Sequence, residues 1–228
     1  MKKNILIIAA HPDDDILGCG GFISKYRAKS NIKVVFIAEG SSCRFLDLNK
    51  NIEKIQRTIE VRNNFAVDAL KVLGVKKISF YDLPCGRLDS IPVIEINKII
   101  ESELSMFKPD VVLTHAEHDT NNDHRIVFRS TLMATRPGKF KSLKTLLSFE
   151  VLSSTEWNFS KAFAPNHFES LSLKHLSLKW KALECFKSEI EEYPHPRSEK
   201  GLKTLAQFRG IQSGFKYAEA FKIIRNFK

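Results

Sequence analysis

The first half of the chain alternates short apolar runs with longer amphipathic stretches. Residues 4–10 are a continuous apolar run of strand length, which is typical of a strand buried on both faces of a parallel sheet. The same patterning predicts further strands over 32–38, 77–81 and 109–114, with helices over 16–29, 51–73 and 91–107. A strand–helix alternation of this kind implies right-handed crossovers. It therefore predicts an α/β fold, a Rossmann-like three-layer α/β/α sandwich with a mostly parallel sheet.

The last third of the chain is patterned less regularly. We expect a strand over 147–152 and helices over 176–191 and 199–208. No internal repeat or low-complexity linker divides the sequence. We therefore expect one domain over residues 1–228, with a core over about 1–150 and a C-terminal elaboration over about 151–228.

Histidine and aspartate cluster where two of the predicted strands end. Residues 11–15 follow the first strand, and residues 115–125 follow the fourth. Ligands of parallel sheets bind beyond the carboxyl ends of the strands, so both clusters are expected at one edge. A catalytic zinc site takes three imidazole or carboxylate ligands and leaves a position for water. His11, Asp14 and His124 are the candidate ligands, and Asp13 is then available as a general base.

Each cluster also has a plainer interpretation. Pro12 and its neighbouring aspartates suit a turn that caps a helix, and residues 122–125 suit the start of another helix. The joint occurrence of the two clusters favours the metal site.

The two clusters resemble the motifs of a known family. Ala10-His11-Pro12-Asp13-Asp14-Asp15 resembles the AHPDDE signature of the PIG-L or LmbE-like zinc-dependent N-deacetylases. Residues 119–125, Asp-Thr-Asn-Asn-Asp-His-Arg, resemble the second motif, D-x-N-x-D-H-R. Residues 153–157, 193–198 and 209–210 resemble blocks of members linked to bacterial surface-sugar pathways, so the resemblance spans nearly the whole chain.

The resemblance implies roles for individual residues. His11, Asp14 and His124 would bind Zn²⁺ or another divalent metal, and Asp13 would act as the catalytic base. Asp123 would orient a histidine or the substrate. The expected substrate contacts are Arg62, Asn121, Asp123, His115 and Arg197.

Three positions depart from the family pattern. Asp15 replaces the usual glutamate of the first motif, and Cys85 stands where sugar-pathway relatives have aspartate. Asn121 stands where some relatives have a histidine that serves the oxyanion or the leaving group. His195 and His115 are the candidates to replace that histidine, with a surface-loop role for His195 equally open.

The activity implied by the resemblance is hydrolysis of an N-acetyl group. The substrate would be an amino sugar or sugar conjugate, free or nucleotide-activated, and the products would be acetate and a free amine. Arg62, Arg197 and the basic C-terminal part would meet any phosphates of the substrate. The alternative is a catalytically inactive sugar- or nucleotide-binding protein on the same fold.

The charge of the chain raises the question of a nucleic-acid partner. Lys and Arg number 36 against 26 Asp and Glu, a formal net charge of +10. The basic residues are interspersed with acids and form no Lys/Arg run or aromatic-basic module, so nucleic-acid binding is not expected. The surplus suits an anionic sugar substrate better.

The remaining composition bears on compartment. The apolar runs are shorter than the roughly 18 residues that span a bilayer, so no stable membrane insertion is expected. The four cysteines show no C-x-x-C spacing, which argues against a cysteine zinc cluster or a disulfide framework. The N-terminal apolar run lacks a cleavage site, and a cytoplasmic protein is expected. Nothing in the sequence indicates an oligomeric state.

Overall fold

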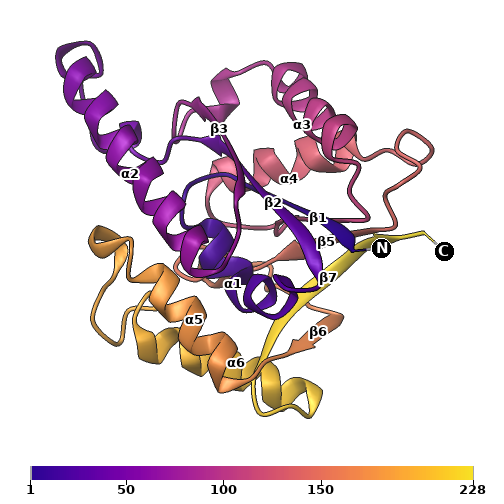
Figure 1. Cartoon of the computed structure of the whole chain (residues 1–228). Helices are drawn as coiled ribbons and strands as arrows, with labels where there is room; N and C mark the ends of the chain where they lie inside the picture. Colours follow the sequence, from indigo (N-terminus) through magenta and orange to yellow (C-terminus); the bar gives the residue numbers. More distant parts are fainter. Residues whose placement is uncertain (1, 228) are drawn as a thin grey trace.

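A seven-stranded sheet forms the centre of the protein in the computed structural model, which describes residues 2–227. The strand order is β3-β2-β1-β4-β5-β7-β6, and helices lie on both faces (Figure 1). The strands are β1 (Lys3–Ala9), β2 (Ser30–Ala38), β3 (Lys77–Leu83), β4 (Val111–His115), β5 (Thr145–Phe149), β6 (His167–Ser170) and β7 (Ala218–Asn226).

The first five strands pair in parallel, and β7 runs the other way, whereas β6 runs in the same direction as β5. β7 pairs antiparallel with both β5 and β6. The predicted α/β fold with a mostly parallel sheet is therefore confirmed.

The alternation of side chains along β1 explains why that strand is continuously apolar. Ile5 and Ile7 belong to the hydrophobic core on one face of the sheet, whereas Leu6 and Ile8 belong to the core on the other. Successive side chains of a strand point to opposite faces. A strand covered by helices on both sides therefore needs apolar residues at every position.

Six α-helices form the outer layers. Residues of α1, α2, α5 and α6 contribute to one core, and residues of α3 and α4 contribute to the other. The helices are α1 (Asp14–Tyr26), α2 (Ile52–Val72), α3 (Val93–Phe107), α4 (Asn122–Ala134), α5 (Leu173–Leu183) and α6 (Glu199–Ser213).

Helix α1 is broken in the middle, and two charged side chains stabilise the break. Cys19 has non-helical dihedrals (φ −146°). Glu219 of β7 accepts hydrogen bonds from the backbone N–H groups of Gly21 and Phe22, at 2.8 and 2.6 Å. Lys179 of α5 donates to the carbonyl of Leu17 at 2.8 Å and to Glu219 at 2.7 Å. Backbone groups that lose their helical partners are thus satisfied by buried side chains.

The C-terminal elements differ most from the sequence expectations. The helix expected over 176–191 is wrong at both ends, because α5 runs from Leu173 to Leu183. Beyond α5, Phe186 leaves helical geometry and becomes fully buried, and a short 3₁₀ turn follows at Lys187–Glu189. The helix expected over 199–208 continues to Ser213 and ends at Gly214, whose positive φ of 75° suits a helix C-cap.

Two further points complete the fold. The strand expected over 147–152 lies instead at Thr145–Phe149. Helix α4 begins at Asn122, in agreement with the helix start that residues 122–125 suit, whereas β6 and β7 had no predicted counterpart. Within residues 2–227, none of the helices has the length and apolar character needed to cross a membrane.

Candidate functional site

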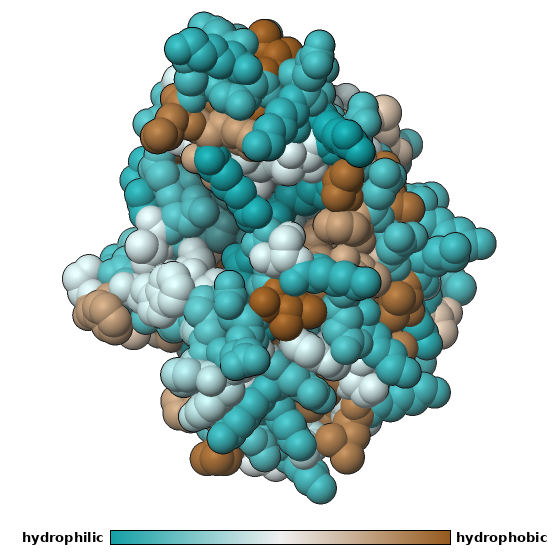
Figure 2. All heavy atoms as spheres, turned by 90° about the vertical axis from the view of Figure 1, so that its left-hand side faces the viewer, coloured by the Kyte–Doolittle hydropathy of each residue, from teal (hydrophilic) through white to brown (hydrophobic). Residues whose placement is uncertain are grey.

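The two histidine–aspartate clusters meet because the strands that precede them are neighbours. β1 and β4 pair directly, and the order of the sheet reverses at this pair. Such switch points are where open α/β sheets bind ligands. The chain termini lie at the other end of the strands, away from the carboxyl ends of β1 and β4 (Figure 1). The face seen in Figure 2 carries a hollow with mainly hydrophilic side chains around it.

The three predicted ligand side chains converge at this switch point. Donor atoms of His11, Asp14 and His124 all lie within 4.8 Å of one another, and all three residues are buried. Asp14 Oδ2 lies 3.3 Å from His11 Nδ1 and 3.2 Å from His124 Nε2.

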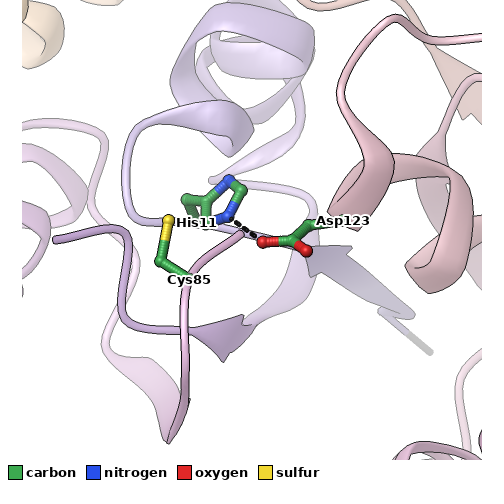
Figure 3. Close-up of side chains that lie close together, drawn as sticks. All are labelled: His11, Cys85 and Asp123. Carbon is green, nitrogen blue, oxygen red and sulfur yellow. Dashed lines mark hydrogen bonds and ion pairs between the residues drawn. The ribbon is translucent and has the colours of Figure 1, made fainter. Parts of the chain in front are cut away.

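A carboxylate holds the second ring nitrogen of each histidine. Asp123 Oδ2 lies 2.9 Å from His11 Nε2 (Figure 3), and Asp119 Oδ2 lies 3.2 Å from His124 Nδ1. Burial opposes protonation, but these carboxylates and Asp14 raise the pKa of His11 to about 10 and that of His124 to about 9. Metal-binding histidines characteristically have such carboxylate partners, which fix the ring orientation.

Backbone N–H groups and hydroxyls hold the two supporting carboxylates in turn. Asp123 accepts hydrogen bonds from the backbone N–H groups of Gly86 at 2.6 Å and Leu88 at 3.2 Å. Asp119 accepts from the hydroxyls of Ser154 and Thr155. Burial alone would raise the pKa of Asp119, yet the hydrogen bonds to His124 and the hydroxyls hold it at about 2. The supporting carboxylates are therefore ionised and fixed.

The donor set fits a divalent metal ion. It consists of two imidazoles and a carboxylate, each oriented by its neighbours, and all three residues line one open cavity. Zinc in catalytic sites takes this kind of ligand set and keeps one position open to the cavity. Magnesium and calcium prefer all-oxygen ligands and fit less well.

His115 lies behind the ligands and outside the cavity wall. It is fully buried, and its ring stacks on His124 with centroids 4.0 Å apart. Its Nε2 accepts a hydrogen bond from the backbone N–H of Ala10 at 2.7 Å. Burial lowers the pKa of His115 to about 3, so the ring is neutral. The structure thus places His115 where it can support His124.

Asp13 lies beside the ligands in a constrained backbone conformation. Its φ of 119° is unusual for a residue with a side chain. The carboxylate is buried, and Oδ2 lies 3.0 Å from both Arg62 Nη2 and Arg197 Nη1. Burial raises the pKa of Asp13, and the two arginines oppose that rise. Three residues from distant parts of the chain thus meet at one carboxylate.

Glu189 completes this network, and sequence reasoning missed it. Its carboxylate oxygens lie 2.6 Å from Arg62 Nη1 and 2.8 Å from Arg197 Nη1, and Arg44 Nη2 lies at 2.5 Å. Burial would raise the pKa of Glu189, but Arg62, Arg44 and their hydrogen bonds lower it to about 2. Glu189 is therefore an ionised counter-ion shared by three arginines.

Asn121 contributes to both the fold and the cavity. Its side chain accepts a hydrogen bond from the backbone N–H of Asp123 at 2.9 Å, which caps helix α4. It also lies in the wall of the cavity next to His124. The cap fixes the first turn of the helix that carries both Asp123 and His124.

The cavity in front of these residues has a volume of about 310 Å³. This volume lies in the range of small-molecule sites. Trp157, about half exposed, supplies an aromatic surface to its wall. The wall is formed by His11, Asp13, Asp14, Gly40, Cys43, Arg44, Arg62, Cys85, Thr120, Asn121, His124, Ser153, Ser154, Trp157, Glu189 and Arg197.

His195 lies next to the cavity and is absent from this wall. Its ring is edge-on to Trp157, with centroids 6.2 Å apart, and its Nδ1 accepts a hydrogen bond from the backbone N–H of Arg197 at 3.2 Å. The structure therefore brings Arg62, Arg197 and Asn121 to the cavity. It places Asp123 and His115 behind the ligands and His195 beside the turn that carries Arg197.

The remaining departures from the family motifs are both buried. Among the described residues, neither carboxylate oxygen of Asp15 has a hydrogen-bond partner, and burial raises its pKa to about 8. Cys85 is buried, its backbone N–H donates to Glu39 at 2.8 Å, and its sulfur lies near His11 and Asp123 (Figure 3).

The chain is similar to known deacetylases over nearly its whole length. The chain is 27% identical to the diacetylchitobiose deacetylase of Thermococcus kodakarensis. The aligned region covers 97% of this chain and 83% of that protein. The solved diacetylchitobiose deacetylase of Pyrococcus horikoshii superposes with a TM-score of 0.76 at 21% identity, over 98% of this chain and 84% of that one.

The same fold also supports a different reaction. The 4-carboxy-2-hydroxymuconate hydratase of Pseudomonas putida superposes with a TM-score of 0.73 at 19% identity, over 98% of this chain and 96% of that one. At these identities the solved structures establish the shared fold, and a fold does not fix a reaction.

The sequence profile of the PIG-L family, described as GlcNAc-PI de-N-acetylase, matches residues 6–135. The matched region holds both histidine–aspartate motifs and the strands that bring them together. Since the match covers more than half of the 228 residues, the resemblance of the two motifs is confirmed, and the chain belongs to the PIG-L family.

Proposed function

We propose that this protein is a metal-dependent hydrolase that removes the acetyl group from an N-acetyl amino sugar. The observation that carries the proposal is the convergence of His11, Asp14 and His124 beside Asp13 in one cavity. A divalent metal such as zinc, when bound there, would polarise the amide carbonyl and make a water molecule more acidic. The curated relative that matches nearly the whole chain is a sugar deacetylase, which supports the same chemistry.

Asp13 is proposed as the general base. Both arginine contacts fall on its Oδ2, and within residues 2–227 no hydrogen bond or ion pair engages Oδ1. Oδ1 is thus available to take a proton from the water that attacks the acetyl carbonyl. Protonated Asp13 can then return that proton to the departing nitrogen as the C–N bond breaks, which yields acetate and an amine.

Arg62 and Arg197 are proposed to orient Asp13. Each guanidinium bridges Asp13 and Glu189, so neither can turn away without breaking an ion pair. A base held in one orientation needs no rearrangement before the proton transfer. His195 is proposed to act one step further out, by accepting the hydrogen bond that shapes the turn at Arg197.

The charges of the cavity favour an uncharged sugar. Arg44, Arg62 and Arg197 are the arginine side chains of the described wall, and all three contact Glu189. A phosphate group would have to displace a carboxylate that already satisfies them. We therefore infer a neutral N-acetyl amino sugar or oligosaccharide, with Trp157 as a surface against which its ring can lie.

Release of acetate tests this proposal. Zinc-loaded protein is incubated with N-acetylglucosamine, N,N′-diacetylchitobiose and a sugar nucleotide, and acetate is followed by proton NMR. The proposal expects acetate from at least one neutral substrate and less from the sugar nucleotide. Saturable binding of these sugars with no acetate from any of them would instead favour the catalytically inactive sugar-binding protein.

A further inference from the structure

Two cysteine thiols lie in contact at the wall of the cavity. Cys43 Sγ and Cys85 Sγ are 3.1 Å apart, and Cys85 donates its hydrogen to Cys43. Cys43 belongs to the 3₁₀ turn Ser42–Arg44 after β2, and Cys85 belongs to the loop after β3. No disulfide joins the two loops, because all four cysteines are free thiols.

The surrounding backbone holds the two thiols together. Glu39 accepts hydrogen bonds from the backbone N–H of Ser42 at 2.9 Å and from that of Cys85 at 2.8 Å, so one buried carboxylate fixes both loops. Gly86 has a positive φ of 72°, and a Cβ at this position would lie 3.2 Å from the Cβ of Cys43. A side chain at residue 86 would therefore press against Cys43.

The two thiols differ in access to solvent. Cys43 is exposed, whereas Cys85 is only 6% exposed. Cys85 lies on the side of His11 and Asp123 (Figure 3). A small oxidant entering the cavity therefore reaches Cys43 first and finds Cys85 directly behind it.

We propose that Cys43 and Cys85 are a peroxide-sensitive dithiol that closes to a disulfide. The Cys43 thiolate attacks one oxygen of hydrogen peroxide, the O–O bond breaks, and Cys43 becomes a sulfenic acid, while the departing hydroxide takes up the proton that Cys43 had released and leaves as water. The Cys85 sulfur then attacks the Cys43 sulfur and expels a second water as the S–S bond forms. Two thiols are oxidised, one peroxide is reduced to two waters, and a dithiol reductant reverses the change.

The acidity of Cys43 agrees with this order of events. The hydrogen bond from Cys85 is the main cause that lowers the pKa of Cys43 to about 6, with further contributions from the charges of His11 and Arg44 and against the effect of burial. The thiolate, rather than the thiol, is the nucleophile.

The bond would tie together two loops that form the cavity. Arg44, next to Cys43, contacts Glu189, and Gly86, next to Cys85, donates to Asp123. The disulfide would therefore link the loop whose Arg44 contacts Glu189 to the loop whose Gly86 holds Asp123, the carboxylate that contacts His11. This proposal rests on the geometry of the two thiols and does not depend on which substrate the cavity takes.

Thiol counting and peptide mass spectrometry on the full chain test the proposal. Stoichiometric hydrogen peroxide should lower the count of free thiols from four to two. It should also yield one crosslinked peptide pair that contains Cys43 and Cys85, and dithiothreitol should restore four thiols. The oxidised protein should unfold at a higher temperature than the reduced protein, because the crosslink restricts the unfolded chain.

Two variants assign the order, and a third is the control. Cys85→Ser should stop the reaction at a sulfenic acid on Cys43, which dimedone traps, whereas Cys43→Ser should leave Cys85 unreacted. Cys185→Ser removes a half-buried thiol elsewhere and should leave the crosslink unchanged. The proposal is overturned if the wild-type protein keeps four thiols, forms only crosslinks between chains, or reaches sulfinic acid at Cys43 without a crosslink.

Discussion

Two networks of buried charges contact helix α1, one at its start and one at its break. The two networks differ in the groups that bind the charged side chains. At the break, Glu219 and Lys179 bind each other and three backbone groups. At the start, among residues 2–227, the carboxylate of Asp13 is bound only by the side chains of Arg62 and Arg197. The first network repairs a helix, and the second holds a carboxylate at a wall that substrate can reach.

The surroundings of the two networks differ in the same sense. The space next to Lys179 and Glu219 amounts to only about 10 Å³, too little for more than about one water molecule. The space next to Asp13 amounts to about 310 Å³. Buried charge alone therefore does not identify a functional site. A functional charge differs from a structural one in that some of its atoms face a cavity, whereas the atoms of a structural charge are all bound by other groups of the fold.

The largest expected effect is on catalysis, from Asp13→Asn. Asparagine keeps the shape of the side chain but cannot accept the proton, so we expect kcat to fall by about 10²–10⁴. Arg62 and Arg197 keep Glu189 as a counter-ion, so the variant should remain folded. Steady-state acetate release and urea unfolding measure the two effects. Asp89→Asn, at an exposed carboxyl outside the cavity, is the control, and equal kcat in both variants would remove Asp13 from the mechanism.

The next largest effect is on stability, from Glu219→Gln. The change leaves Lys179 buried without a counter-ion, which costs about 3 kcal/mol of unfolding free energy. We expect kcat of the folded variant to stay at the wild-type value, the reverse of Asp13→Asn.

Two further variants sharpen this result. Glu169→Gln breaks a partly exposed pair with Lys25 and should cost less than Glu219→Gln, because Lys25 remains partly in contact with solvent. The double variant Lys179→Met/Glu219→Gln should be more stable than the sum of the single changes predicts, because no buried charge remains unpaired. A Glu219→Gln protein that is fully stable but inactive would show that this network serves catalysis and not stability, which would contradict the proposed difference between the two networks.

A smaller effect is expected on substrate selectivity, from Glu189→Gln. This change removes the counter-ion that occupies Arg44, Arg62 and Arg197. A charge-assisted hydrogen bond contributes about 1.5 kcal/mol, so kcat/KM should shift roughly tenfold toward an anionic substrate relative to a neutral one. Glu191→Gln removes the same charge at an exposed position nearby and should leave the ratio unchanged. If the wild-type protein already prefers the anionic substrate, the inferred neutrality of the sugar is wrong.

The smallest effect is expected from His195→Ala. The ring lies outside the described cavity wall and accepts one backbone hydrogen bond, which is worth about 1 kcal/mol. We expect kcat/KM to fall by less than about tenfold, with the pH profile unchanged. His175→Ala, in the capping box of α5, is the control. Loss of one limb of the pH profile would instead make His195 a proton donor in the reaction.

The sequence predicts those elements whose side chains all lie in the same kind of environment, such as a strand that is buried on both faces. β1 is buried on both faces, so Ile5–Ile8 are all apolar and the strand is plain from the sequence. β7 carries Glu219 at a buried position, because that glutamate satisfies the broken helix α1. Its pattern therefore does not indicate a strand. Phe186 ends α5 by becoming buried, which periodicity alone does not reveal.

The same division holds for the site. His11, Asp13, Asp14 and His124 lie in two compact motifs and are predictable from them. Glu189 is not, because its partner Arg44 lies 145 residues away and no local pattern marks the pair. The phosphate contacts expected for Arg62 and Arg197 assumed free guanidinium groups, whereas the fold supplies both with carboxylates.

The most direct test of the account is to measure bound metal and acetate release on the same samples. The wild-type protein is stripped with a chelator, titrated with zinc, and assayed on N,N′-diacetylchitobiose at each step, alongside His124→Ala. We expect no acetate from the stripped protein, activity that rises in proportion to zinc up to one equivalent per chain, and neither tight zinc binding nor activity in His124→Ala. Acetate release that persists after complete metal removal, or that is equal in His124→Ala, would contradict this expectation.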